Sequence, residues 1–174
     1  MTDVLVRPAV LDDLPRLTEI YNYYIVNSPI TFDIETYTVE RRTAWFEQFA
    51  LTGRYRLLVA ESNGTVVGYT GTTRFRPKAA YDTTVETTIY CAPETTRKGV
   101  GGLLYAALFE AISIEDINRV LAGYTLPNPA SAALHQRFGF KLAGVFNENG
   151  RKFGRYWDVA WLERPLKLGK AKEL

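Results

Sequence analysis

The sequence predicts one α/β domain in which helices cover the faces of a mixed β-sheet. Segments with the periodicity of strands and of helices follow one another in the order β-α-α-β-β-β-α-β-α-β-β. The 174 residues are 47% apolar and 13% aromatic, which supports a packed core rather than a disordered chain. Asn63-Gly64, between two β-rich runs, is a strong hairpin signal and adds an antiparallel pair to the sheet.

Hydrophobic periodicity, turn residues and helix caps set the expected bounds of each element. The expected strands are Val4–Arg7, Arg56–Glu61, Thr65–Phe75, Thr84–Cys91, Arg119–Thr125, Lys141–Val145 and Tyr156–Arg164. The expected helices run from Asp12 or Asp13 to about Asn27, from about Thr38 through Phe49, over Val100–Ile114 and over Pro129–Phe138. Asp12 or Asp13 should cap the first helix, which has Pro15 in its first turn.

The domain is expected to cover residues 1–165. The remaining tail, Leu166–Leu174, contains three lysines, and we expect it to fray.

The counts of histidine and cysteine exclude several kinds of site. One cysteine cannot form an internal disulfide. One histidine and one cysteine cannot build a zinc finger or a His-rich zinc site, so no metal is expected. A Cys–His nucleophile pair could be formed only by Cys91 with His135. A net charge of +2 gives no broad basic surface, so nucleic acid is not an expected partner.

The N-terminal segment and the apolar runs bear on location. Charged residues, from Asp3 to Asp13, interrupt each apolar stretch at the N-terminus, which is unlike a signal peptide. The longest nearly apolar run, Gly99–Phe109, is too short to cross a bilayer. We therefore expect a cytoplasmic protein with no membrane partner.

The turn after the strand Thr84–Cys91 carries the strongest chemical signal. It contains Arg97-Lys98-Gly99-Val100-Gly101-Gly102 and leads into a helix. Glycines let a ligand approach the backbone, and the first N–H groups of a helix are unpaired and carry partial positive charge. With the two cations, this turn suits a phosphate or pyrophosphate. The alternative is a plain glycine-rich turn with solvated basic residues.

Two familiar phosphate loops do not fit this turn. Lys98 precedes the glycines, whereas the Walker pattern has its lysine after them, and Leu104 replaces the last glycine of the dinucleotide pattern. The turn resembles the pyrophosphate loop of the GNAT superfamily of N-acetyltransferases, [Gln/Arg]-x-x-Gly-x-[Gly/Ala], with Gly99 and Gly101 in place. Thr96 stands where Gln or Arg is usual. Either Arg97 supplies the cation, or backbone N–H groups bind the anion alone.

The chain as a whole resembles the branch of that superfamily that contains phosphinothricin and methionine sulfoximine acetyltransferases. The matching motifs are Ile20-Tyr21-Asn22, Thr31-Phe32, Arg76-Pro77, Tyr81, Thr84–Tyr90, Asn128 with Ser131, Leu134-His135, Gly139-Phe140, Lys152–Arg155 and Trp157-Asp158-Val159. The resemblance implies the GNAT acyl-CoA N-acyltransferase fold and acetyl-CoA as co-substrate. It also implies that the acceptor is the α-amine of a small amino-acid-like molecule, and that the protein is a homodimer.

The resemblance assigns the residues that bind acetyl-CoA. The backbone of Ile89-Tyr90-Cys91 would hydrogen-bond the pantetheine arm, and one of its N–H groups would polarise the thioester carbonyl. The turn Arg97–Gly102 would hold the pyrophosphate, and Asn128 and Ser131 would add hydrogen bonds. From the residues alone, the strand could equally be paired in the sheet, and Asn128 could simply cap the helix that begins at Pro129.

Glu86 is the candidate general base. Strand alternation puts it on one face with Thr88 and Tyr90. A carboxylate within an otherwise uncharged strand is costly to bury without a partner, which often marks a functional site. The base would act on the acceptor ammonium through a water. The alternative is a solvated carboxylate or one paired to an arginine.

His135 is the candidate acid. The superfamily usually has a Tyr at this position, and the related branch is similar to this chain in having a His there. The resemblance implies that this histidine protonates the departing CoA thiolate. An imidazolium could do so because the ordinary pKa of histidine is near 6.5. The alternative is a helix histidine that packs or caps. Cys91 would lie beside the thioester as a bystander.

An arginine suits the carboxylate of the expected acceptor because it binds bidentately. The resemblance places Arg76 in that role, with Pro77 and Lys78 shaping the loop and Arg74 as the alternative. Tyr21, Asn22, Tyr24 and Phe32 would line the acceptor entrance, although core packing also explains Tyr21.

Two other functions stay open from the sequence. One is acetylation of a different amine, such as a polyamine or a protein N-terminus. The other is an acyl-CoA-binding module without catalysis, which the departure at Thr96 makes conceivable and the presence of Glu86 argues against.

Overall fold

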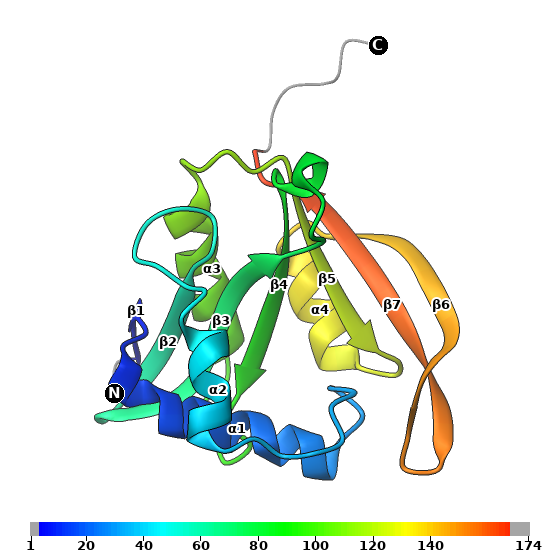
Figure 1. Ribbon diagram of the computed structural model, residues 1–174, viewed down its shortest axis with the longest axis horizontal. Coiled ribbons are helices and arrows are strands. Elements are labelled where there is room, and N and C mark those ends of the chain that lie inside the picture. Colours follow the sequence, from blue (N-terminus) through cyan, green and yellow to red (C-terminus); the bar gives the residue numbers. More distant parts are fainter. Residues whose placement is uncertain (1–3, 168–174) are drawn as a thin grey trace.

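The computed structural model describes residues 4–167 and contains a seven-stranded mixed sheet with helices on both faces (Figure 1). The strands are β1 (Val4–Pro8), β2 (Leu57–Ser62), β3 (Thr65–Arg74), β4 (Thr84–Cys91), β5 (Arg119–Thr125), β6 (Lys141–Lys152) and β7 (Arg155–Pro165). The helices are α1 (Leu14–Asn27), α2 (Val39–Phe46), α3 (Val100–Ile112) and α4 (Pro129–Arg137), with short 3-10 turns η1 (Leu11–Asp13) and η2 (Ala79–Tyr81). The predicted α/β class and the predicted order of strands and α-helices are confirmed.

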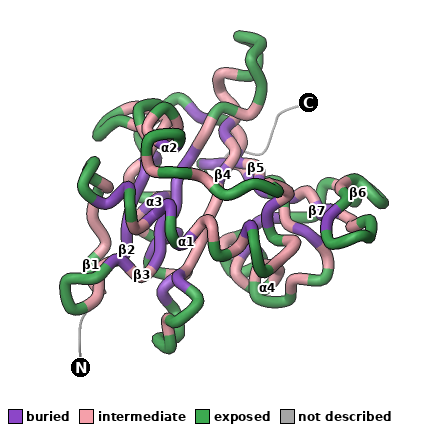
Figure 2. The backbone as a smooth tube through the Cα atoms, turned by 60° about the horizontal axis from the view of Figure 1, so that its bottom comes forward, coloured by how far each residue is buried: buried purple, intermediate pink, exposed green. Residues whose placement is uncertain are grey.

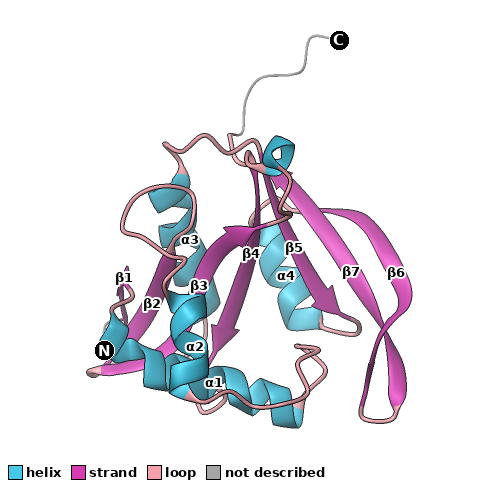
Figure 3. Cartoon of the chain, in the orientation of Figure 1, coloured by secondary structure: helices cyan, strands magenta, loops and turns pink. Residues whose placement is uncertain are grey.

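The two faces of the sheet are covered by different helix pairs, α1 with α2 and α3 with α4 (Figure 3). On the first face, Leu17 and Ile20 of α1 pack with Val59 and Tyr69 of the sheet. On the other face, the α3 residues Tyr105, Leu108 and Ile112 pack with Val85 and Val120 of β4 and β5. The apolar spacing along each helix explains this arrangement, because residues three and four apart share one side.

The strand order is β1-β2-β3-β4-β5-β7-β6, and the pair β4–β5 is the parallel one. Their register covers only Thr84–Glu86 against Arg119–Leu121. Beyond Glu86 the two strands diverge, as Figure 1 shows. Strand β5 stays paired with β7 along its whole length, and β4 stays paired with β3 to Cys91. The C-terminal half of β4 therefore has one edge without a neighbouring strand in the described sheet.

The short-range signals in the sequence gave mixed results. Asn63-Gly64 forms the expected hairpin turn, and both residues have left-handed φ angles, 52° and 75°. Helix α2 begins beside the predicted start near Thr38, and the Thr38 side chain caps it by accepting from the Arg41 N–H at 3.3 Å. Pro15 lies in the first turn of α1, as expected.

The prediction that an aspartate side chain caps α1 is wrong. Asp13 precedes α1, but its carboxylate accepts from the Arg7 guanidinium at 2.8 and 2.9 Å and from the Val10 N–H at 2.9 Å. A charged partner on β1 and the N–H at the start of η1 thus take both carboxylate oxygens. Burial alone would raise the pKa of the Asp13 carboxyl, but the hydrogen bonds from Arg7 and from the Val10 N–H hold that pKa below its ordinary value.

The C-terminal hairpin is longer than predicted. The strand expected at Lys141–Val145 continues to Lys152 and turns at Phe153-Gly154 into β7. The register shifts between Leu142 and Gly144 and again between Phe146 and Gly150, and the second shift accommodates the polar segment between Phe146 and Gly150 within the strand. Figure 2 shows β6 as largely exposed, and β6 is the last strand of the sheet.

Two other boundaries differ by a few residues. Helix α2 ends at Phe46 and α3 ends at Ile112, each before the expected end. Leu166, predicted as the first residue of the tail, is buried, and its N–H donates to the Asn118 carbonyl at 3.2 Å. The rest of the predicted tail from residue 168 on lies outside the described residues, so its predicted fraying stays a prediction.

Candidate active site

The divergence of β4 from β5 opens a cavity of about 510 Å³. Its walls come from the free edge of β4, the start of α3, the end of β5, helix α4, and Tyr24 and Ile30 from the α1 side. The predicted acetyl-CoA residues that line it are Ile89, Tyr90, Cys91, Gly99, Gly101, Gly102, Asn128 and Ser131, joined by the predicted acid His135. Residues far apart in sequence are thus brought together as the resemblance implied.

The start of α3 forms one end of this cavity. Gly99 is the N-cap with a left-handed φ of 92°, a conformation that glycine adopts without strain. A side chain at Gly101 would lie 3.3 Å from Leu134, and one at Gly102 would lie 3.2 Å from the Arg137 guanidinium. The glycines therefore keep open a space between the helix N-terminus and α4.

The cationic side chains of the turn lie outside the cavity lining. Arg97 and Lys98 are exposed and do not line the cavity, whereas Arg137 of α4 does. The Val100 side chain is buried in the core, so Val100 can serve a ligand only through its backbone N–H. Arg137 is thus the cation that lines the α3 end of the cavity, beside Gly102.

Strand β4 presents its backbone edge along the cavity. Residues 87–91 all line it, although their other edge is hydrogen-bonded to β3. The Tyr24 hydroxyl donates to the Cys91 carbonyl at 2.6 Å, so that acceptor is already satisfied. The Tyr90 ring is enclosed by Tyr69, stacked at 5.5 Å, and Tyr21, edge-on at 5.2 Å. Burial raises the pKa of the Cys91 thiol, which keeps it protonated at neutral pH.

Asn128 and Ser131 meet at the first turn of α4. The Asn128 side chain accepts from the Ser131 N–H at 3.0 Å, which confirms Asn128 as the helix cap. Both residues also line the cavity, so the capping role and contact with a ligand are compatible.

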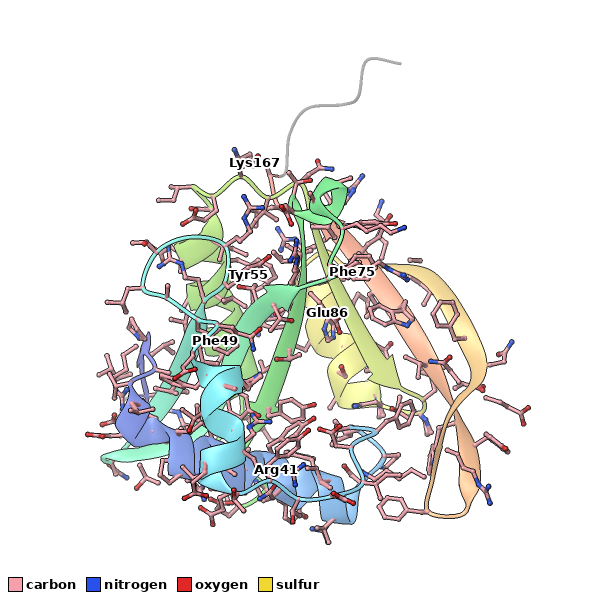
Figure 4. The ribbon with its side chains drawn as sticks, viewed as in Figure 1. Arg41, Phe49, Tyr55, Phe75, Glu86 and Lys167 are labelled. Carbon is pink, nitrogen blue, oxygen red and sulfur yellow. The ribbon has the colours of Figure 1, made fainter. Side chains whose placement is uncertain are left out.

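Glu86 lies where the β4–β5 pairing ends, and Figure 4 labels it beside the gap between those strands. Among residues 4–167, no side chain forms a salt bridge or a hydrogen bond with its carboxylate. Burial raises the pKa of the Glu86 carboxyl, and no nearby cation lowers it. Glu86 does not line the cavity itself, but Thr88, two residues along the same face, does. Alternate residues on one face of a strand are about 7 Å apart, which is the spacing between Glu86 and the cavity-lining Thr88.

His135 lies 3% exposed in the cavity wall with both ring nitrogens engaged. Nδ1 is 2.7 Å from the Ser131 carbonyl, which assigns the proton to Nδ1, and Nε2 then accepts from the Tyr105 hydroxyl at 3.0 Å. Burial lowers the pKa of His135 despite the Ser131 carbonyl, which favours the charged form. The ground state is thus a neutral imidazole, and donation from Nε2 requires the imidazolium. The acid role stays a prediction.

The residues predicted to bind the acceptor carboxylate lie on the exposed loop between β3 and η2. The Arg76 guanidinium lies 5.0 Å from the Phe75 ring, and Pro77 and Lys78 are exposed. Arg74 is paired with Asp82 at 3.0 Å. This loop does not line the cavity, so its role stays a prediction. Of the two arginines, Arg76 is the one without an ion pair among the described residues.

The four residues expected at the acceptor entrance occupy distinct places. Tyr24 lines the large cavity, and Tyr21 lines a second cavity of about 180 Å³ on the α1–α2 side of β4. The Asn22 side chain holds both the N–H and the carbonyl of Tyr37. Phe32 packs on Gly150 of the β6–β7 hairpin.

Sequence reasoning missed several residues of this region. Tyr105, Tyr124 and Arg137 line the large cavity, and Asp33 and Arg42 line the second one. Tyr105 and Tyr124 lie at positions that the apolar pattern assigns to core. Arg137 follows His135 by two residues, and only the position of α4 against α3 brings it to Gly102.

Residues 4–167 contain no group of three or more His, Cys, Asp or Glu side chains able to hold a metal ion. None of their helices has the length and apolar character needed to span a membrane.

Comparison with known proteins agrees with this geometry. A family model described as an acetyltransferase (GNAT) domain matches residues 6–161. The phosphinothricin N-acetyltransferase of Streptomyces coelicolor is 51% identical over 166 residues, covering 94% of this chain and 97% of that protein. An L-methionine sulfoximine/L-methionine sulfone acetyltransferase of Pseudomonas paraeruginosa is 31% identical over 161 residues, covering 92% and 94%.

Solved structures give the same answer. A GNAT superfamily phosphinothricin acetyltransferase from Sinorhizobium meliloti, in complex with acetyl-CoA, has a TM-score of 0.87 at 31% identity, covering 98% of this chain and 95% of that one. The predicted resemblance and the predicted N-acetyltransferase class are confirmed. The chain belongs to the GNAT family of acetyltransferases.

Proposed function

We propose that the protein transfers the acetyl group of acetyl-CoA directly to the α-amine of a small amino-acid-like acceptor, of the methionine sulfoximine, methionine sulfone or phosphinothricin type. One observation carries the proposal. The pairing of β4 with β5 ends at Glu86, whose carboxylate has no partner among the described residues and which lies two residues from Thr88, in the wall of a cavity bounded by a strand edge and a helix N-terminus. The relatives, a phosphinothricin N-acetyltransferase and an L-methionine sulfoximine/L-methionine sulfone acetyltransferase, supply the class of acceptor.

The cavity fits an extended acyl-CoA. Its volume, about 510 Å³, suits the pantetheine arm, and its α3 end combines free N–H groups with the Arg137 guanidinium for the pyrophosphate. The β4 backbone at Ile89–Cys91 would pair with the arm and hold the thioester carbonyl. When bound, acetyl-CoA supplies an activated acetyl group on sulfur. Asn128 and Ser131 would add contacts at the α4 side.

Glu86 would remove the proton of the acceptor ammonium. Its raised pKa brings the carboxyl closer to neutral pH than an ordinary glutamate and makes it a stronger base. The free amine then attacks the thioester carbon, a C–N bond forms, and the C–S bond breaks. The proton taken from the amine passes through a water to Glu86 and then to solvent.

His135 would act on the departing thiolate through Tyr105. In the imidazolium form, Nε2–H donates to the Tyr105 oxygen, and the Tyr105 hydroxyl is then free to donate into the cavity. Because burial lowers the pKa of His135, this route weakens on the alkaline side. An alkaline fall in turnover that His135→Gln abolishes would support it. Unchanged turnover with weaker acetyl-CoA binding would leave His135 a packing residue.

The α-carboxylate of the acceptor would bind Arg76. This guanidinium has no carboxylate partner among the described residues, whereas Arg74 already has Asp82. Replacing Arg76 by Gln should raise the KM for the acceptor without changing acetyl-CoA affinity.

A homodimer through the β6–β7 hairpin completes the proposal. Strand β6 is twelve residues long and lies at the edge of the sheet. Several apolar side chains of the hairpin are more than half exposed: Leu142, Phe146, Phe153 and Tyr156. An exposed apolar edge of this kind usually pairs with another chain. Sedimentation velocity should give twice the monomer mass, and Phe146→Glu should give the monomer.

The decisive test is a panel of acceptors with acetyl-CoA, read by the free thiol released. The panel contains methionine sulfoximine, methionine sulfone, phosphinothricin, a polyamine and a peptide with a free N-terminus. Turnover of the first three supports the proposal. Turnover of the polyamine or peptide alone would contradict the acceptor class. Acetyl-CoA binding without turnover of any amine would indicate a binding module.

A further inference from the structure

A second cavity lies on the α1–α2 side of β4, with a volume of about 180 Å³. It adjoins the large cavity, because Thr88 and Tyr90 line both. Its other lining residues are Tyr21, Asp33, Tyr37, Arg42, Trp45 and Tyr69. Thr88 and Tyr90 share the Glu86 face of the strand, so this cavity opens next to the place where the acceptor amine would react.

Arg42 of α2 is an unusual cation in this cavity. Its side chain is buried, at 5% exposed, whereas the neighbouring Arg41, labelled near the lower end of α2 in Figure 4, is exposed. The Arg42 guanidinium lies 3.9 Å from the Trp45 ring and 4.3 Å from the Tyr21 ring. These rings hold the charge in place. Within residues 4–167, Arg42 forms no ion pair, and its Nε–H has no hydrogen-bond partner.

The Tyr69 hydroxyl is the second unsatisfied polar group of the same cavity. Tyr69 is 1% exposed, and its hydroxyl, which the Arg42 guanidinium approaches, has no acceptor for its proton within the described part of the chain. Its ring is fixed between Trp45 and Tyr90. Buried polar atoms nearly always find a partner in a protein or its ligand. Two unsatisfied donors in one cavity therefore point to a ligand oxygen.

The charges around the cavity favour an electron-rich oxygen. Asp33 also lines it, but the Tyr21 hydroxyl donates to that carboxylate at 2.7 Å, and Asp33 interacts electrostatically with the buried Lys152 of β6. Asp33 thus has partners of its own, and Arg42 is the cation left without one. An apolar acceptor tail would leave both Arg42 and Tyr69 unsatisfied.

We infer that Arg42 and Tyr69 form a specificity subsite for an oxygen bound to sulfur or phosphorus in the tail of the acceptor. The inference rests on the proposed function for the position of the amine, near Thr88 and Glu86. The Arg42 Nε–H and the Tyr69 hydroxyl donate to the tail oxygen, and the surrounding rings contact its methyl or methylene groups. Neither residue takes part in the transfer step, so they set which amino acid is accepted.

The turnover test compares methionine sulfone and phosphinothricin with norleucine, whose tail has no oxygen. Tyr69→Phe should lower the ratio of kcat/KM for methionine sulfone over norleucine about fivefold, and Arg42→Lys about tenfold or more. Tyr55→Phe is the matched control, because Tyr55 packs on the α3 side of the sheet. An equal loss on all three acceptors would overturn the inference, since a purely structural role predicts that result.

A binding test keeps the inference separate from the proposed function. The Nε–H signal of Arg42 is identified in a ¹H–¹⁵N spectrum by its absence from Arg42→Lys, and dimethyl sulfone or methylphosphinate is then titrated into the whole protein. The signal should shift, and Tyr69→Phe should require about fivefold more probe. If no amine is acetylated but the signal still shifts, the proposed function fails and the subsite stands. If neither probe moves the signal, the subsite is wrong.

Discussion

The contact between Phe32 and Gly150 joins the β6–β7 hairpin to the loop beside the second cavity. A Cβ atom at Gly150 would lie 2.2 Å from the Phe32 ring, far inside van der Waals contact. The neighbouring Lys152 ammonium donates to the Thr31 carbonyl at 2.8 Å, which fixes the same two segments. We therefore predict that Gly150→Ala displaces Phe32 and, with it, Asp33.

The size of this effect follows from two opposing terms. Overpacking a fitted contact costs about 1–3 kcal/mol. Replacing glycine by alanine at a compatible backbone position stabilises by about 0.4–1 kcal/mol, through the unfolded state. Gly150→Ala should therefore lower the free energy of unfolding by about 1–2 kcal/mol. Gly144→Ala, on the same strand with nothing within 4 Å, should not lower it.

The assay is urea unfolding of the two single variants and of Gly150→Ala combined with Phe32→Ala, against Phe32→Ala alone. Because the second substitution removes the colliding ring, the cost of Gly150→Ala should disappear in that background. Steady-state kinetics should show a raised KM for the acceptor with unchanged acetyl-CoA affinity. If Gly150→Ala matches Gly144→Ala in stability, Phe32 does not lie over Gly150 and the proposed link between hairpin and loop is wrong.

Three further predictions follow from the large cavity. Burial lowers the pKa of His135 in the folded state, so the stability that neutral His135 contributes is present above its unfolded pKa, near 6.5, and is lost as pH falls towards the folded pKa. His135→Asn should flatten this part of a Tm-against-pH curve. An unchanged slope would contradict the lowered pKa of His135. Because its pKa is raised, the Cys91 thiol should react slowly with maleimide, and bound CoA should slow the reaction further. Cys91→Ala should keep turnover. Equal labelling with and without CoA would place the Cys91 thiol outside the CoA site. Measured by calorimetry, Arg137→Gln should raise the Kd for acetyl-CoA about fivefold and Arg97→Gln less than twofold. The opposite order would show that Arg97, and not Arg137, is the cation that binds the pyrophosphate.

Much of the architecture follows from local patterns in the sequence. The hairpin at Asn63-Gly64 and the cap at Thr38 depend on a few adjacent residues, so their signals are readable along the chain. The β6–β7 hairpin was predicted too short because the polar segment after Phe146 interrupts the apolar alternation. Pairing with β7 on both sides of this segment keeps it in the strand. The Asp13 side chain was misassigned because its partner Arg7 lies on strand β1, outside the helix start that the local pattern describes.

The candidate site divides in the same way. Backbone positions such as Ile89, Gly99 and Gly101 could be assigned because a motif fixes them relative to one strand and one helix. Arg137 could not be assigned, because only the packing of α4 against α3 brings it to Gly102. Arg42 lies next to an exposed arginine in a helix, and nothing in the sequence distinguishes the buried one from the exposed one.

A pH profile of Glu86→Gln tests whether Glu86 is the base of a direct transfer. The measurement is kcat/KM for the best acceptor from about pH 5 to 9, beside acetyl-CoA affinity and the control Glu110→Gln on the exposed side of α3. The variant should lose about 10²–10⁴-fold in kcat/KM, keep its acetyl-CoA affinity, and lose the acid limb that the wild type shows above the ordinary pKa of glutamate. An unchanged kcat/KM across this pH range would show that Glu86 is not the base of the transfer.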